Sequence, residues 1–102
     1  MPTITLNKKE VLKLLGRKIS DRQLEKSIPM LGTDLEAVTK DSIEVEIFPN
    51  RPDMLSEEGF ARALSSFLGI KKGLRHYKVK NSEYKVNIEK KSKKIIPFAA
   101  AA

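Results

Sequence analysis

The sequence predicts an α+β fold, with three helices and a small, largely antiparallel sheet. Apolar and acidic residues alternate over residues 43–47, which is the pattern of a strand with one buried face. Apolar residues recur at helical spacing over residues 60–68. Glycines and prolines follow each of these short patterned segments, so the elements are short and closely connected.

A strand and a helix open the chain. Residues 2–6 alternate apolar side chains with threonine, which indicates a short strand. Asn7 followed by Glu10 is a capping-box pattern with asparagine at the cap, and it predicts a helix that ends at Gly16.

A second helix should follow after a brief link. Ser20 with Gln23 is another capping box and opens a helix that runs toward Gly32. Pro29 removes one hydrogen bond from that helix, so a kink or an early end is expected. Two short helices joined by residues 16–19 suggest an αα-hairpin that resembles a helix-turn-helix.

A hairpin, a stiff corner and a third helix come next. Residues 34–38 and 42–48 can pair around the turn at 39–41. In the corner Asn50-Arg51-Pro52-Asp53, the prolines fix φ and prevent the helix from starting before Pro52. The helix should extend from about Ser56 to Leu68, with Asp53 and Ser56 as the candidate caps.

The C-terminal end is strongly basic. Residues 70–102 carry ten lysines and arginines against two glutamates, a net charge of +8, whereas the preceding residues have a net charge of −1. This asymmetry indicates a nucleic acid or an acidic partner, and a solvated lysine-rich face is the alternative. Residues 84–88 alternate like a strand, residues 90–94 form a polar link, and residues 95–98 resemble the start of a buried strand.

Several separated blocks resemble one known family. Phe-Pro-Asn-Arg-Pro-Asp at residues 48–53 opens a longer match that extends to Leu64, and it is joined by residues 2–16 and 29–36. In this order they strongly resemble the N-terminal part of the phenylalanyl-tRNA synthetase β subunit of the archaeal and eukaryotic-cytosolic type. The resemblance implies that residues 1–78 form an N-terminal module, and that residues 79–102 are a basic linker with strands leading toward an absent editing region.

The resemblance also implies a role. The parent enzyme would charge tRNA(Phe) with phenylalanine, using ATP and magnesium, as an assembly of two α and two β subunits. Independently of the resemblance, the cytoplasm is the default compartment, because the sequence has no cysteine and no signal-peptide pattern. This segment would be a structural and interaction module that contacts the rest of the β subunit, the α subunit and, as one option, tRNA(Phe). The alternative function is a free-standing, helix-turn-helix-like nucleic-acid-binding domain.

Catalytic patterns are missing from the sequence. It has no cysteine, and its single histidine, His76, has no neighbouring nucleophile or orienting partner. It contains neither a glycine-rich phosphate loop nor a nucleophile elbow. No apolar run approaches the ~20 residues of a membrane span. We therefore expect no active site, no cofactor and no membrane contact in this segment.

Three groups of side chains are candidate sites. Arg51 can stiffen the structural corner (Asn50, Arg51, Pro52, Asp53) through a two-bond contact with Asp53 or Glu57, or it can reach a partner subunit or a tRNA phosphate. Carboxylates at the helix start can cap the helix or share a divalent cation, and the capping role is favoured, so no metal is expected. The weak metal candidates are Asp53, Glu57 and Glu58, and the candidate nucleic-acid contacts, next to Tyr77, are Lys71, Lys72, Arg75 and Lys78.

Overall fold

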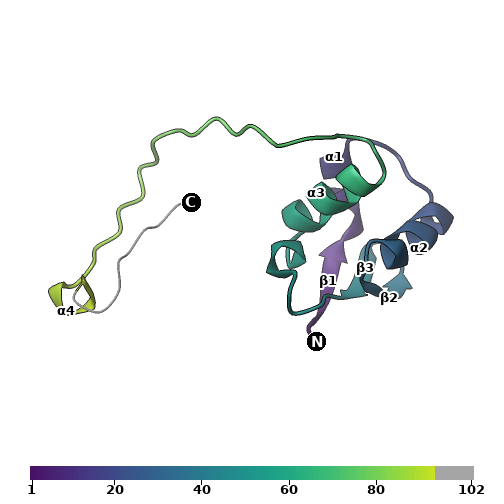
Figure 1. Ribbon diagram of the computed structural model, residues 1–102, viewed down its shortest axis with the longest axis horizontal. Helices are drawn as coiled ribbons and strands as arrows, with labels where there is room; N and C mark the ends of the chain where they lie inside the picture. Colours follow the sequence, from purple (N-terminus) through teal and green to yellow (C-terminus); the bar gives the residue numbers. More distant parts are fainter. Residues whose placement is uncertain (94–102) are drawn as a thin grey trace.

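A three-stranded antiparallel sheet forms the base of the molecule in the computed structural model, which describes residues 1–93. The strands are β1 (Thr3–Asn7), β2 (Asp34–Val38) and β3 (Ser42–Glu46), and they lie in the order β1-β3-β2. Figure 1 shows the N-terminal strand β1 beside the hairpin that β2 and β3 form. The predicted hairpin and the predicted antiparallel sheet are both confirmed.

The register brings the apolar positions of the strands to one face. Ile4 and Leu35 both lie opposite Val45, and Val38 lies opposite Ile43. A bulge between Leu35 and Ala37 interrupts the hairpin, so that apolar residues on both sides of it still face the core. β3 is shorter than predicted and ends at Glu46, before the first proline of the corner.

Three helices are capped as the sequence predicts. α1 (Lys8–Leu15) begins after Asn7, whose side chain accepts the N–H of Glu10 at 3.1 Å, and ends at Gly16 in the left-handed conformation (φ 69°). α2 (Asp21–Met30) begins after Ser20 in the same manner and ends one residue beyond Pro29. In α3 (Glu57–Phe67), Ser56 is the capping residue.

The helices cover one face of the sheet. Ile43 and Val45 of β3 are fully buried beneath them, whereas Glu44 and Glu46, between and beside these residues, are partly exposed. α1 packs mainly against α3, and α2 lies against β2 rather than forming a closely packed hairpin with α1. The core is formed by Leu6, Val11, Leu15, Ile19, Leu24, Ile28, Ile43, Val45, Ile47, Met54, Phe60, Ala61 and Leu64.

The chain leaves this body after α3. Beyond Tyr77 it runs away from the sheet and helices without regular structure until α4 (Lys90–Lys93), a single turn inside the predicted polar link (Figure 1). The strand predicted over residues 84–88 is wrong, since Tyr84 and Val86 are exposed and no strand lies beside them in the described part of the chain. An alternating pattern forms a strand only where a partner satisfies its backbone groups. The strand predicted from residue 95 lies outside the described residues.

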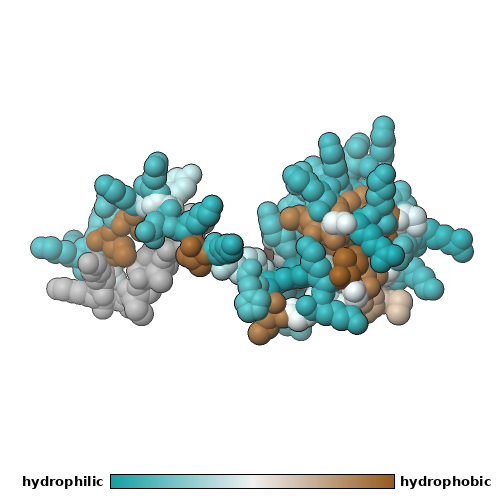
Figure 2. Space-filling view, turned by 90° about the horizontal axis from the view of Figure 1, so that it is seen from above, coloured by the Kyte–Doolittle hydropathy of each residue, from teal (hydrophilic) through white to brown (hydrophobic). Residues whose placement is uncertain are grey.

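The face of the molecule seen in Figure 2 is largely hydrophilic. In the view of Figure 2, polar and charged side chains surround a smaller group of hydrophobic atoms in the middle of the body. None of the helices within residues 1–93 is long and apolar enough to cross a membrane.

Candidate functional site

The corner between β3 and α3 is fixed by local bonds. The N–H of Arg51 donates to the carbonyl oxygen of Phe48 at 3.0 Å, closing a turn that contains Asn50. Pro52 then begins a short 3-10 helix, η1 (Pro52–Met54), which places the fully buried side chain of Met54 in the core. Met54 thus anchors the corner, although no periodicity or motif in the sequence singles it out.

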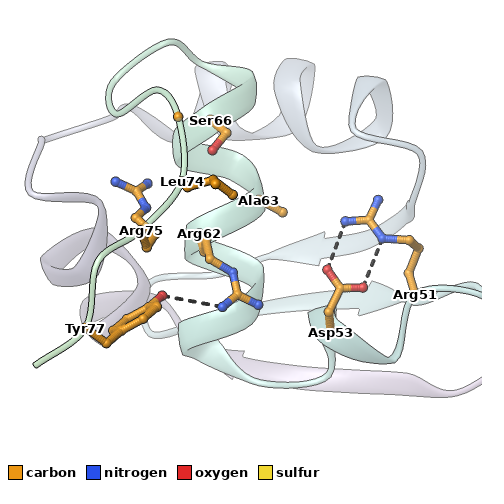
Figure 3. A pocket seen from close by; sticks show the side chains of 9 residues that line it. Arg51, Asp53, Arg62, Ala63, Ser66, Leu74, Arg75 and Tyr77 are labelled. Atoms are coloured by element: carbon orange, nitrogen blue, oxygen red, sulfur yellow. Dashed lines mark hydrogen bonds and ion pairs between the residues drawn. The ribbon is translucent and has the colours of Figure 1, made fainter. Parts of the chain in front are cut away.

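Arg51 and Asp53 form a two-bond ion pair. Nε of Arg51 lies 3.0 Å from Oδ1 of Asp53, and Nη2 lies 3.0 Å from Oδ2 (Figure 3). This hydrogen-bonded contact lowers the pKa of Asp53 and raises the pKa of Arg51. Of the two candidate caps, Ser56 caps α3, and the carboxylate of Asp53 is engaged by Arg51 instead.

The backbone of the corner lies in very close contact with the first turn of α3. A Cβ atom placed on Gly59 would lie 1.7 Å from the carbonyl oxygen of Asp53, closer than any real contact. Only glycine therefore allows the helix to approach the corner in this way. Gly59 lies in the segment that resembles the family and in the first turn of the predicted helix. Glycine is disfavoured within a helix, so its presence there is the sequence feature that indicates a close approach of another backbone segment.

Two of the three candidate metal ligands are engaged by separate protein groups. Asp53 binds Arg51, and Oε1 of Glu57 accepts the backbone N–H of Asn7 at 3.0 Å. That bond lowers the pKa of the Glu57 carboxyl. Glu58 is exposed in the same turn, and within residues 1–93 no three His, Cys, Asp or Glu side chains gather as metal ligands would.

A pocket of about 450 Å³ opens beside the corner, along the outer side of α3. Figure 3 shows guanidinium groups from three segments around it, those of Arg51, Arg62 and Arg75. Nη1 of Arg62 lies 3.5 Å from the hydroxyl of Tyr77, and Arg75 donates to Oγ of Ser65 at 3.2 Å, so the segment that follows α3 is tied to this helix at two points. With Asp53 as its one lining carboxylate, the pocket is positively charged and suits a small anion.

The four candidate nucleic-acid contacts do not converge on this pocket. Arg75 lines it and also lines, together with Lys71, a second hollow of about 250 Å³ on the neighbouring side of α3. Lys72 and Lys78 are exposed and line neither of these two hollows. The structure therefore brings Arg75 together with Arg51 and Arg62, which the sequence does not suggest.

The sequence matches the model of one protein family. The family model described as the Phe-tRNA synthetase beta subunit B1 domain matches residues 1–70, which include the whole sheet, the corner and α1 to α3. The chain belongs to this family. The resemblance inferred from the segment that begins at Phe48 is thereby confirmed.

Relatives of this B1 domain occur in archaea. The phenylalanine–tRNA ligase beta subunit of Archaeoglobus fulgidus is 49% identical over 90 residues, which cover 87% of this chain and 16% of that subunit. The corresponding subunit of Methanopyrus kandleri is 42% identical over 105 residues, covering 100% of this chain and 18% of its own length. The chain thus spans less than a fifth of either relative.

A solved structure has the same fold. It is the crystal structure of an N-terminal fragment of the phenylalanyl-tRNA synthetase beta-subunit from Pyrococcus horikoshii, with 31% sequence identity and a TM-score of 0.63. The match covers 80% of this chain and 25% of that one. The corner residues 50–53 lie inside the B1 family match, whereas the basic residues from Lys71 onward lie beyond it.

Proposed function

We propose that this B1 domain is a structural and interaction module of a phenylalanine–tRNA ligase β subunit, without catalytic chemistry of its own. The observation that carries the proposal is the family match over residues 1–70, because it coincides with the complete packed body. The comparisons do not favour the alternative of a free-standing nucleic-acid-binding domain, since the relatives are β subunits along the full length of the match.

The parent enzyme, in this proposal, joins phenylalanine to tRNA(Phe) with ATP and magnesium in the cytoplasm. The domain would contact the rest of the β subunit and the α subunit in an assembly of two α and two β chains. A body with a stiff corner and tightly packed helices is suited to this role because it presents its surface in one fixed geometry. Residues 1–78 would form the module, and residues 79–102 would lead toward the following region.

The proposal is tested in the whole ligase. A β subunit that lacks residues 1–70 is co-produced with the α subunit, and the assembly state, ATP–pyrophosphate exchange and tRNA(Phe) charging are measured beside the intact enzyme. We expect impaired assembly or impaired charging, since the module's contacts are lost. An assembly with unchanged mass, stability and charging would overturn the proposal.

A second measurement addresses catalysis. The 102-residue chain alone should show no aminoacylation, no ATP–pyrophosphate exchange and no hydrolysis of mischarged tyrosyl-tRNA. Turnover that persists through repurification and is abolished by a point substitution in this chain would contradict the non-catalytic assignment.

A further inference from the structure

A third pocket, of about 580 Å³, lies along α1, between that helix and the turn that joins β2 to β3. It is formed by two segments far apart in sequence, residues 8–18 and residues 40–41. We call it the basic groove. Its lining residues are Lys8, Lys9, Leu12, Lys13, Gly16, Arg17, Lys18, Lys40 and Asp41.

Lys8 holds the two sides of the groove together. Its backbone N–H donates to the carbonyl oxygen of Asp41 at 3.0 Å, and its ammonium donates to the carbonyl oxygen of Thr39 at 2.7 Å. The same ammonium pairs with Asp21, at the start of α2, at 2.6 Å. Since Lys8 is 8% exposed, its charge is used internally, and the turn that carries Lys40 is fixed against α1.

The other cations of the groove are exposed. Lys13 makes an exposed pair with Glu10 at 3.6 Å. Within residues 1–93, no ion pair involves Lys9, Arg17, Lys18 or Lys40. The N–H of Gly16 donates to the carbonyl oxygens of Leu12 and Lys13 at the end of α1, so these two oxygens already accept a hydrogen bond from the backbone. Four cations that lack a partner in the described chain thus surround one hollow.

The groove concentrates the positive charge of a body that is nearly neutral as a whole. Residues 1–69 contain ten lysines and arginines, of which six line the groove, and eleven acidic residues, of which one does. The lining residues alone therefore have a net charge of +5, and the rest of the body has −6. When Asp21 and Glu10, the partners of Lys8 and Lys13, are counted with the groove, the two values become +3 and −4. Part of that negative charge lies on the outer face of the sheet, where Asp34 is paired in register with Glu46. Such separation of charge creates a strong local field for polyanions.

We propose that the basic groove binds the sugar–phosphate backbone of RNA. Lysine ammonium groups and an arginine guanidinium at the rim can bind phosphate oxygens, while the half-buried Leu12 in the lining can contact the apolar face of a ribose. No aromatic, amide or hydroxyl side chain that could read a base lines the groove. The choice of RNA over an acidic protein rests on the proposed function, which places this domain in an enzyme that acts on tRNA.

The test compares two variants of the 102-residue chain that lose the same number of charges. In the groove variant, Lys9, Arg17, Lys18 and Lys40 are each replaced by glutamine. In the matched variant, Lys71, Lys72, Arg75 and Lys78 are replaced instead. Lys8 is kept, because its bonds hold the groove in shape. Binding to a tRNA transcript is followed by fluorescence anisotropy over a series of salt concentrations, and amide NMR spectra verify that both variants are folded.

The groove variant should bind the tRNA at least tenfold more weakly at 100 mM salt. Its plot of log Kobs against log salt should be shallower by about 3, since each lost phosphate contact removes about 0.7–0.9 from the slope. The matched variant should change less on both counts. With the unsubstituted chain, tRNA should shift amide signals of residues 9–18 and 40.

Two results would overturn the proposal. Equal weakening in both variants would mean that net charge alone attracts the RNA. Binding of poly-L-glutamate as tightly as RNA of equal charge would assign the groove to an acidic protein surface. Because these measurements use the isolated chain, a failure of the groove is distinguishable from a failure of the module in the assembled ligase.

Discussion

Glu57 and Asn7 are joined by a hydrogen bond across fifty residues of sequence, with Oε1 of Glu57 accepting the backbone N–H of Asn7 at 3.0 Å. The bond connects the first turn of α3 to the residue at which β1 ends and α1 begins. Because Glu57 is also in the first turn of its own helix, its negative charge is favoured by the helix dipole as well as by the N–H of Asn7.

This bond should make stability depend on pH. The pKa of Glu57 is lowered in the folded state, so its contribution is present above the ordinary value of 4.5 and is lost as the pH falls through the lower folded value. At pH 7, Glu57→Gln should cost about 1 kcal/mol, since the bond loses its charge at a half-exposed site. The difference in melting temperature between Glu57→Gln and the unsubstituted chain should shrink as the pH falls below 4.5.

The control is Glu58→Gln, which removes a charge from the same helical turn but leaves the bond to Asn7. Its melting temperature should stay closer to that of the unsubstituted chain. Equal losses in the two variants, with equal pH dependence, would show that only the charge at the helix start matters.

Gly59→Ala should be severely destabilising. Elsewhere in a helix, alanine is better than glycine by about 0.5–1 kcal/mol. Here the added Cβ would lie 1.7 Å from the carbonyl oxygen of Asp53, so either the corner or α3 must shift. We expect a loss of about 3 kcal/mol or more, measured by urea unfolding. Ser66→Ala, on the exposed side of α3, is the matched control and should be nearly neutral. A stable Gly59→Ala variant would refute the close approach.

The corner contains a helix cap, Ser56, and an ion pair between Arg51 and Asp53, whose contributions to stability can be measured separately. Ser56→Ala should cost about 1 kcal/mol, since Ser56 Oγ accepts the N–H of Gly59 at 3.2 Å. Asp53→Ala should cost less, about 0.2–1 kcal/mol, because its pair with Arg51 is exposed to solvent. Thermal unfolding of both variants shows which substitution lowers the stability more. A larger loss for Asp53→Ala would mean that the ion pair, more than the cap, holds the junction.

The same corner allows a test for metal. Addition of magnesium should leave the melting temperature of the unsubstituted chain unchanged, because Asp53 and Glu57 are each engaged by a protein partner. A rise that depends on magnesium and disappears in Asp53→Ala would instead support a cation site at the helix start.

The proposed boundary near residue 78 should be visible to a protease. Brief trypsin treatment should cleave first after Lys78, Lys80 or Lys85, which are exposed in a segment without regular structure. Lysines and arginines in the body are just as numerous, but most lie in helices that must open before cleavage. Mass spectrometry of the surviving fragment gives the boundary, and early cleavage before residue 70 would contradict it.

Local signals in the sequence predict most of the fold. Asn7 and Ser20 are caps because each is followed by the right residues at the right spacing, and the hairpin follows from alternation on both sides of Thr39. The strand predicted at residues 84–88 fails because alternation does not state whether a partner strand exists. The pairing of β1 with β3 joins residues about forty positions apart, so no short-range sequence pattern specifies it either.

The candidate sites show the same limit. The contact between Arg51 and Asp53 spans two residues and follows from the stiffness of the corner. In contrast, the basic groove joins residues near position 10 to a turn near position 40, and no local pattern indicates this contact. Lys8 and Lys9 are adjacent and identical in type, but the side chain of Lys8 is buried and bonded to Thr39, whereas that of Lys9 is exposed. The net charge of residues 1–69, −1, describes the body as nearly neutral. It does not show that the fold places positive and negative side chains on different faces.

Asn7 has a consequence for the order in which the chain can fold. It pairs with Ser42 at the end of β1, its side chain caps α1, and its backbone binds Glu57. Two of these three links close loops of tens of residues, whose entropy must be overcome before the contacts can stabilise anything. The N-terminal strand should therefore be fixed late, together with the closing of α3 onto α1, and the body should form in one cooperative step. During synthesis, the first seven residues must wait until Glu57 has left the ribosome before all their partners exist.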